Sequence, residues 1–224
     1  SVLVGYSLMG IPLEYLLAAT FMSAPAGLLI AKIIIPLPKE EREKIKESDR
    51  GLKVEVNGDE RAANVIDAAA TGASTGVKMV IEVAAALLAF VAIIALLNGG
   101  VFGFELTLDK IFGIILAPIA FLIGVPWEEA MISGQFIGQK IAVNEFVAFA
   151  GLGEIIHTLS DKTAMILSFA LAGFANLGSI AIQIGSLGTL APNRRGEVSK
   201  LGVRAMIGGC LVSLLNAAIA GMFI

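Results

Sequence analysis

The stretch that decides the fold is Gly138-Gln139-Lys140-Ile141-Ala142-Val143-Asn144-Glu145-Phe146-Val147-Ala148-Phe149, residues 138–149. It places a lysine and a glutamate inside a long apolar region. Ionisable side chains at membrane depth cost several kcal/mol unless they face a cavity or a partner, so they are candidates for function. Residues 173–179 place glycines, an asparagine and a serine inside a second apolar span. Two such interrupted segments are typical of a transport site near the middle of a membrane.

Composition predicts an all-α integral membrane protein. Hydrophobic residues make up 57% of the 224 residues and charged residues 16%, whereas soluble domains are about half apolar and a quarter charged. The charges gather at residues 39–61, which hold seven of the 16 basic and eight of the 19 acidic residues. No basic patch indicates a nucleic-acid polymer as partner. A single cysteine and a single histidine exclude a disulfide framework and do not favour a structural metal site.

The chain divides into six parts. Residues 12–35 are long enough to cross a bilayer at about 20 residues per helix, although Pro25 interrupts them. The predicted parts are the second half of a broken helix plus a spanning helix at 1–35, a charged aqueous loop at 36–61, an interfacial helix and two membrane helices at 62–125, a re-entrant hairpin at 126–157, a broken helix at 158–191, and a cytoplasmic loop with the last spanning helix at 192–224.

Some of these parts carry further detail. An Asn-Gly turn allows a small β-hairpin at residues 51–59. Residues 62–76 hold polar groups among alanines and are expected at the interface, ahead of membrane segments at 78–97 and 107–125. Three arginines and a lysine surround the loop at 191–200. The positive-inside rule therefore predicts that this loop is cytoplasmic and that the last span follows it.

The hairpin is predicted from the residues that interrupt the apolar segment at 130–154. These are glycines, a lysine and the pair Asn144-Glu145, which a straight spanning helix does not carry in its middle. A re-entrant hairpin with arms near 128–138 and 145–154 accommodates them, because irregular backbone is tolerated at membrane depth where it is buried in protein or lines water.

A faint internal repeat links residues 179–188 to residues 1–10, with serine, aliphatic residues and glycine in register. Paired repeats are common in secondary transporters, so the chain is expected to be half of an inverted-repeat transporter. Ser1 then lies in the middle of a broken helix whose first half is upstream. The absence of an initiator methionine and of a signal peptide agrees with a missing upstream part. Coincidence among a few aliphatic residue types is the alternative.

Residues 138–149 resemble the signature of the concentrative nucleoside transporter family, with Gly138-Gln139-Lys140, three residues, and then Asn144-Glu145-Phe146-Val147-Ala148-Phe149. Four other segments are similar to the same family and follow in its order: Met22-Ser23-Ala24-Pro25-Ala26, Gly124-Val125-Pro126-Trp127-Glu128, Gly173-Phe174-Ala175-Asn176, and Ala191-Pro192 with the basic pair after it. The resemblance covers essentially the whole chain.

The resemblance implies a sodium-coupled symporter that imports nucleosides such as uridine by elevator-type alternating access, as a homotrimer in the inner (plasma) membrane. It implies no cofactor beyond the coupling sodium ion and no enzymatic activity. The substrate-binding residues that it implies are Glu145, Asn144, Phe174, Asn176 and Ser179. The cation site that it implies has its downstream edge at Ser1, Val2 and Leu3. The chain departs from the family because it holds no Gly-Gln-Thr-Glu-like motif, which in the family belongs to a first hairpin and contacts the nucleobase.

The polar residues of the two interrupted segments suit a ribose. Glu145 can accept two hydrogen bonds from a vicinal diol, and a charged acceptor makes stronger bonds than a neutral one; the alternative is a structural ion pair with Lys140. Asn176 and Ser179 lie three residues apart, on one face of a helix, and each offers a donor and an acceptor; the alternative is packing between helices. Phe174 either walls the ligand or belongs to the core.

The sequence therefore predicts a carrier that moves nucleosides inward with a cation gradient, in which Asn144 holds the tip of the hairpin. A proton-coupled nucleoside carrier and a non-transport membrane scaffold are the alternatives. An intramembrane enzyme around His157, Ser160 and Asp161 is a further alternative. Nothing supplies it with an oxyanion hole or a positioned nucleophile, and a helix cap at Ser160 or Asp161 explains these residues.

Overall fold

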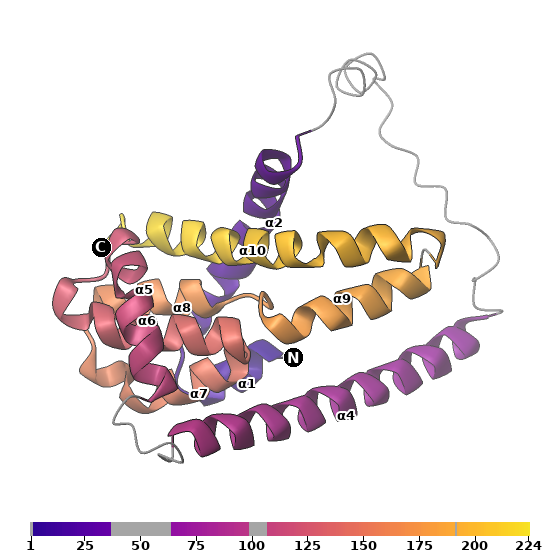
Figure 1. The fold of residues 1–224 in the computed structure, drawn as a ribbon, viewed down its shortest axis with the longest axis horizontal. Helices are drawn as coiled ribbons and strands as arrows, with labels where there is room; N and C mark the ends of the chain where they lie inside the picture. Colours follow the sequence, from indigo (N-terminus) through magenta and orange to yellow (C-terminus); the bar gives the residue numbers. More distant parts are fainter. Residues whose placement is uncertain (1, 37–63, 99–106, 191) are drawn as a thin grey trace. The chain divides into compact units, whose positions relative to one another are not determined.

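A computed structural model describes residues 2–36, 64–98, 107–190 and 192–224, and every regular element in these ranges is a helix (Figure 1). The β-hairpin considered at residues 51–59 lies outside the described ranges. In chain order the elements are α1 (Val2–Leu8), α2 (Leu13–Ile34), α4 (Val65–Asn98), α5 (Leu108–Leu122), α6 (Trp127–Ala142), α7 (Glu145–Ile155), η2 (Ile156–Thr158), α8 (Asp161–Leu171), α9 (Leu177–Leu190), η3 (Pro192–Arg194) and α10 (Arg195–Ala220).

The chain forms two compact units, one of residues 36–91 and one of residues 1–35 and 92–224. α4 is a single helix of 34 residues. The sequence predicted an interfacial helix at 62–76 and a separate membrane segment at 78–97, and the structure joins them without a break. The physical reason is that this stretch is rich in alanine and contains no proline, which is the residue that ends or kinks a helix most strongly.

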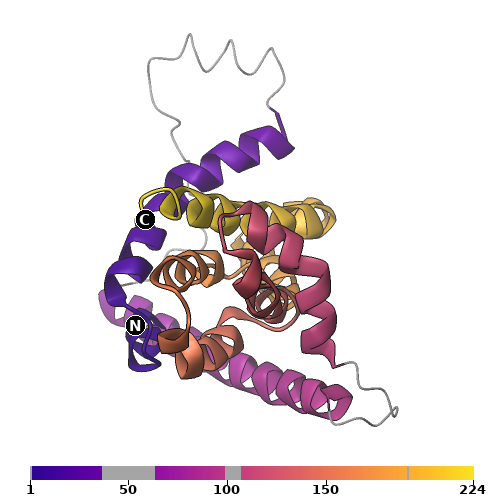
Figure 2. The same cartoon turned by 90° about the vertical axis from the view of Figure 1, so that its left-hand side faces the viewer.

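α2 and α10 are the two described helices that are long and apolar enough to cross a membrane by themselves. They pack against each other (Figure 2), and Asn216 Nδ2 on α10 donates to Ser23 Oγ on α2 over 3.1 Å. α10 begins at Arg195, so part of the loop predicted at 191–200 is helical. Glu197 in its first turn favours this earlier start, because an acid there complements the helix dipole. The chain is therefore a helical membrane protein.

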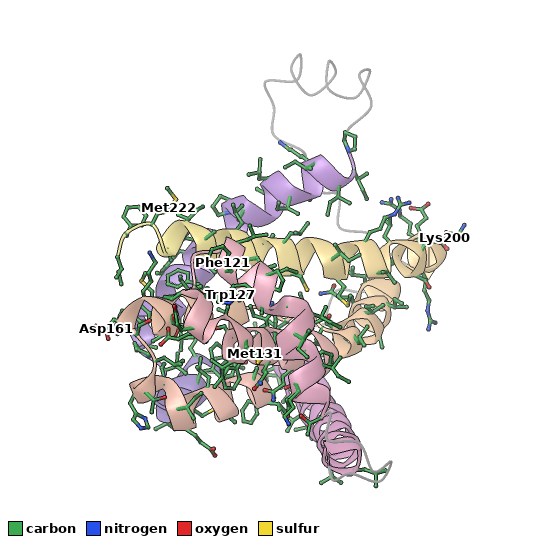
Figure 3. The ribbon with its side chains drawn as sticks, turned by 60° about the vertical axis from the view of Figure 1, so that its left-hand side comes forward. Phe121, Trp127, Met131, Asp161, Lys200 and Met222 are labelled. Carbon is green, nitrogen blue, oxygen red and sulfur yellow. The ribbon has the colours of Figure 1, made fainter. Side chains whose placement is uncertain are left out.

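The chain bends by 117° between α5 and α6. Gly124 makes this turn with a φ of +107°, which L side chains rarely adopt. Phe121 and Trp127 meet edge to face across the turn, with ring centroids 5.6 Å apart (Figure 3). α5 has 15 residues and is about 22 Å long, less than the roughly 30 Å of a hydrocarbon core. It is therefore too short to be the full membrane helix expected at 107–125.

Glycines line the contact between α5 and α6. A Cβ at Gly134 would lie 2.8 Å from the Ala117 amide nitrogen, and a Cβ at Gly138 would overlap the Phe112 side chain. α6 runs through both glycines without a break. The sequence analysis took the glycines of this segment as interruptions, and the structure corrects that interpretation. They are small so that two helix backbones can approach closely, as is common in membrane helix packing.

The core of the larger unit lies mainly among α1, α2, α6, α7, α8 and α10. Phe149 and Leu152 from α7 and Ile166 and Leu171 from α8 are fully buried in it. α10 runs alongside α8 and α9 (Figure 1). This packing surrounds the two places where helices break, after α6 and after α8, and it holds those breaks at fixed positions.

The α5–α6 contact predicts the effect of one added methyl group. Gly134→Ala in the full gene product should destabilise the protein by about 1–3 kcal/mol, because the new Cβ meets backbone atoms that cannot move aside. The matched control is Gly27→Ala in the middle of α2, where a Cβ meets nothing within 4 Å and alanine has the higher helix propensity. The measurement is the thermal unfolding temperature in detergent. An equal or higher unfolding temperature for Gly134→Ala would contradict the close-packing interpretation.

Candidate functional site

Two helix breaks lie within the core of the larger unit. α6 ends at Ala142 and α7 begins at Glu145, while α8 ends at Leu171 and α9 begins at Leu177. α6 packs against both α7 and α8. The first arm of the hairpin was predicted to end near residue 138. α6 continues through Lys140 to Ala142, so the first break lies later in the chain than predicted. What breaks the helix is the pair Val143 and Asn144, whose backbone leaves the helical conformation.

Asn144 caps α7. Its backbone is extended, and its Oδ1 accepts the Val147 amide hydrogen over 3.0 Å. Such a cap satisfies one of the amide groups that a helix N-terminus leaves without a partner. Glu145 follows as the first residue of α7, where the positive end of the helix dipole favours a carboxylate. The Asn144 side-chain oxygen is thus used to start the second arm of the α6–α7 pair.

Asn176 and Ser179 cap α9 reciprocally. Asn176 Oδ1 accepts the Ser179 amide hydrogen over 2.8 Å, and Ser179 Oγ accepts the Asn176 amide hydrogen over 3.2 Å. The Ser179 hydroxyl also donates to the Asn176 carbonyl oxygen over 2.6 Å. The arrangement is a capping box, so Asn176 lies before the helix. The expectation that both residues lie on one face of a helix is wrong for this reason.

The two breaks meet at the Glu145 carboxylate. Its Oε1 accepts the Tyr6 hydroxyl over 3.0 Å, and its Oε2 accepts Asn176 Nδ2 over 3.3 Å. Glu145 and Asn176 are each 6% exposed, so this carboxylate is held away from bulk solvent by donors from α1 and from the start of α9. The structure thereby brings three predicted residues, Glu145, Asn176 and Ser179, into one cluster.

Tyr6 is a member of this cluster that the sequence analysis did not identify. Its ring packs against Phe149, with ring centroids 4.5 Å apart, and more loosely against Phe146. A signal was present, because a tyrosine in an otherwise aliphatic segment needs a partner for its hydroxyl when it is buried. The partner could not be named from the sequence, because Glu145 lies far along the chain.

Lys140 is hydrogen-bonded to the end of α8, just before the second helix break. It is 2% exposed, and its Nζ donates to the Ala170 carbonyl oxygen over 3.2 Å and to Ser213 Oγ over 2.7 Å. Ala170 lies in the last turn of α8, where carbonyl groups lack helical partners and the dipole favours a cation. Lys140 and Glu145 do not form an ion pair within 4.0 Å. The structural ion pair considered from the sequence is therefore not formed.

The remaining predicted residues lie outside this cluster. Phe174 is 64% exposed and makes none of the contacts that hold the carboxylate. Val2 and Leu3 form the start of α1, and Ser1 lies outside the described residues. Val2 is half exposed and Leu3 is partly buried.

Ser160, one of the three residues that suggested a hydrolase, has structural partners. Ser160 caps α8, since its Oγ accepts the Thr163 amide hydrogen over 3.3 Å. Its amide and hydroxyl donate to the two Glu129 carboxylate oxygens over 2.9 Å and 2.6 Å. These contacts connect the start of α6 to the start of α8, and they account for Ser160 without any catalytic role.

The chain is similar to several known proteins along nearly its whole length. The family profile described as "Na+ dependent nucleoside transporter C-terminus" matches residues 15–221. The chain is 55% identical over 231 residues to "Uncharacterized transporter YutK" of Bacillus subtilis, and 46% identical over 235 residues to "Nucleoside permease NupC" of Helicobacter pylori. Among solved structures, it is similar to CNTnw in an inward-facing substrate-bound state, with a TM-score of 0.83 and 48% sequence identity.

These matches cover nearly all of this chain but only part of each relative. The chain is covered completely by both relatives, and it covers 56% of the Bacillus subtilis protein and 54% of the Helicobacter pylori protein. The alignment with CNTnw covers 99% of this chain and 53% of that one. The chain thus spans about half the length of the curated relatives that it matches.

The contacts of Lys140 predict a loss of stability when its charge is removed. Lys140→Met keeps the apolar stem but leaves the Ala170 carbonyl and the Ser213 hydroxyl without their charged donor. We expect a loss of about 1–3 kcal/mol in the full gene product, measured as a lower unfolding temperature. Lys200→Met is the matched control, because Lys200 is exposed near the start of α10 (Figure 3). Equal unfolding temperatures for the two variants would mean that the buried contacts of Lys140 make no net contribution to the stability of the protein.

Proposed function

Because the chain belongs to the family of Na+ dependent nucleoside transporters, which are permeases and not enzymes, we propose that the full protein imports nucleosides across the plasma membrane together with sodium ions. The observation that carries this proposal is the buried Glu145 carboxylate at the meeting point of two helix breaks. A buried carboxylate is costly in a membrane protein, and a substrate that uses it explains why it is kept.

The proposed role of Glu145 is to accept the hydroxyl groups of the ribose. A carboxylate offers about four acceptor positions, and Tyr6 and Asn176 occupy two of them. The rest of its acceptor capacity is proposed to serve the hydroxyls of a vicinal diol. Asn176 Nδ2 has a second hydrogen that can donate to the same sugar. Ser179 contributes by holding Asn176 in place, since its own hydroxyl already donates to backbone.

The other predicted substrate residues have supporting roles in this proposal. Asn144 places Glu145 at the start of α7 by capping that helix. Phe174 is exposed within the α8–α9 break, so its ring is available to cover a ligand seated at the carboxylate. Exposure of a large aromatic ring next to a buried polar cluster is what a ligand wall requires before the ligand binds.

The proposed architecture is that of an elevator-type carrier. The α6–α7 pair, within residues 126–157, is proposed to be a re-entrant hairpin, and α8 with α9 a broken helix. Asparagine caps at the starts of α7 and α9 support this, because half-helix termini near the membrane midplane are the usual way to build a polar site in lipid. We further propose that the chain is half of an inverted-repeat transporter, and that the protein is a homotrimer.

The proposed coupling ion is sodium, as the description of the family profile suggests. Ser1, which lies outside the described residues, is proposed to form the downstream edge of its site together with Val2 and Leu3 at the start of α1. Coupled transport requires that each solute be bound mainly in the presence of the other, which is a reciprocal coupling free energy. A proton gradient is the alternative driving force, and the choice of ion gradient in a transport assay decides between the two.

Glu145→Gln is expected to abolish transport without unfolding the protein. In proteoliposomes containing the full gene product, an inward sodium gradient should drive uptake of radiolabelled uridine. Glu145→Gln should reduce that uptake by at least about 100-fold, because a neutral amide loses two charge-assisted hydrogen bonds to the sugar. Glu154→Gln is the matched control, because Glu154 is an exposed carboxylate on the same helix, α7.

The outcomes of this assay separate the candidate functions. Uptake driven by a pH gradient in place of the sodium gradient would keep the carrier and replace the ion. If neither gradient drives uptake in protein shown to be folded, nucleoside transport is contradicted and the non-transport membrane scaffold is the remaining hypothesis. Full activity of Glu145→Gln would mean that the carboxylate does not bind the substrate.

A second prediction concerns the sugar. 2′,3′-Dideoxyuridine lacks both hydroxyls and should compete with uridine uptake at least about tenfold more weakly than unlabelled uridine itself, because it leaves the buried carboxylate without its partners. The measurement is the inhibition constant of each competitor. Equal inhibition by the two compounds would contradict recognition of the diol by Glu145.

A further inference from the structure

The hydrogen bond between Tyr6 and Glu145 joins α1 to the first turn of α7. Tyr6 is 4% exposed and Glu145 6% exposed, and the hydroxyl and Oε1 lie 3.0 Å apart. The ring of Tyr6 also packs against Phe149 on α7. The contact between α1 and α7 therefore includes a polar part, the hydroxyl, and an apolar part, the ring, and a single substitution can remove the first and keep the second.

The two donors to Glu145 differ in a way that gives Tyr6 the larger part in orienting the carboxylate. The Tyr6 bond is the shorter, at 3.0 Å against 3.3 Å for Asn176 Nδ2. Hydroxyl groups also make shorter and stronger bonds to carboxylates than neutral amides do. With Oε1 held by Tyr6, the rotation of the carboxylate about its terminal bond is restricted, and the remaining acceptor positions point in a defined direction.

We propose that Tyr6 is a positioning residue that acts through Glu145: its hydroxyl orients the carboxylate for the sugar diol. The proposal rests on the function proposed above, because it assigns Glu145 to the sugar.

The proposal is tested with Tyr6→Phe, which keeps the ring against Phe149 and deletes only the hydroxyl. Binding of radiolabelled uridine to the purified full gene product is measured in sodium and in choline. We expect Tyr6→Phe to raise the Kd for uridine in sodium about tenfold, the size of one lost charge-assisted hydrogen bond. Tyr15→Phe is the matched control, since Tyr15 also packs against a phenylalanine ring, that of Phe169.

Two readouts separate positioning from a purely structural role. In a Glu145→Gln background, Tyr6→Phe should change the Kd less than about twofold, because residues that act through one another are not additive. The ratio of the Kd of 2′,3′-dideoxyuridine to that of uridine should also fall in Tyr6→Phe, a measurement that does not need Glu145→Gln to bind. General loosening of the fold would weaken both ligands equally and would lower the unfolding temperature.

Each outcome decides the proposal. An unchanged Kd for uridine in Tyr6→Phe, or equal weakening of uridine and its dideoxy analogue, overturns the role of Tyr6 while leaving nucleoside transport in place. Absence of uridine binding by the wild-type protein, in sodium and in choline, overturns the proposed function itself. Wild-type binding is thus the control that tells the two failures apart.

Discussion

The rest of the structure depends on one constraint, the cost of keeping the Glu145 carboxylate buried in a membrane protein. A buried charge is tolerated when fixed dipoles and hydrogen-bond donors replace the water that it has lost. Here the start of α7, the Asn176 amide and the Tyr6 hydroxyl supply them. Each of these groups is available only because a helix begins or ends nearby. The helix breaks are therefore the means by which an apolar fold holds a charge.

The second buried charge follows the same rule with opposite sign. Lys140 meets a backbone carbonyl in the last turn of α8, the negative end of a helix, whereas Glu145 lies at the positive end of α7. The two charges do not form a direct ion pair. Each is stabilised by a helix terminus, and this leaves part of the acceptor capacity of the carboxylate unused. A direct ion pair would have taken up that capacity, so the separation of the two residues keeps Glu145 available to a ligand.

The comparison of sequence and structure shows which signals are local and which are not. The break before Glu145 follows from local chemistry, since an asparagine between two apolar runs is a strong N-cap and a charge marks the same place. Gly134 and Gly138 were misread because glycine has two uses in membrane helices, and only the position of α5 shows that these two serve close packing. The capping box of Asn176 and Ser179 depends on where a helix starts. The partner of Tyr6 depends on a contact between distant segments of the chain. Periodicity along one segment does not contain that information.

The position of the carboxylate also bears on how an ion and a substrate can be coupled in so small a site. The groups that surround it come from the beginning, the middle and the last third of this chain, on α1, at the start of α7 and just before α9. A ligand that donates to the unused acceptor positions of the carboxylate need not break the bonds to Tyr6 and Asn176, so the site is organised before the ligand arrives and loses little entropy on binding. Any event that moves α1 instead changes the bond to Oε1 first. Coupling requires an element whose state both solutes bias, and a movement of α1 would reach the carboxylate through Tyr6.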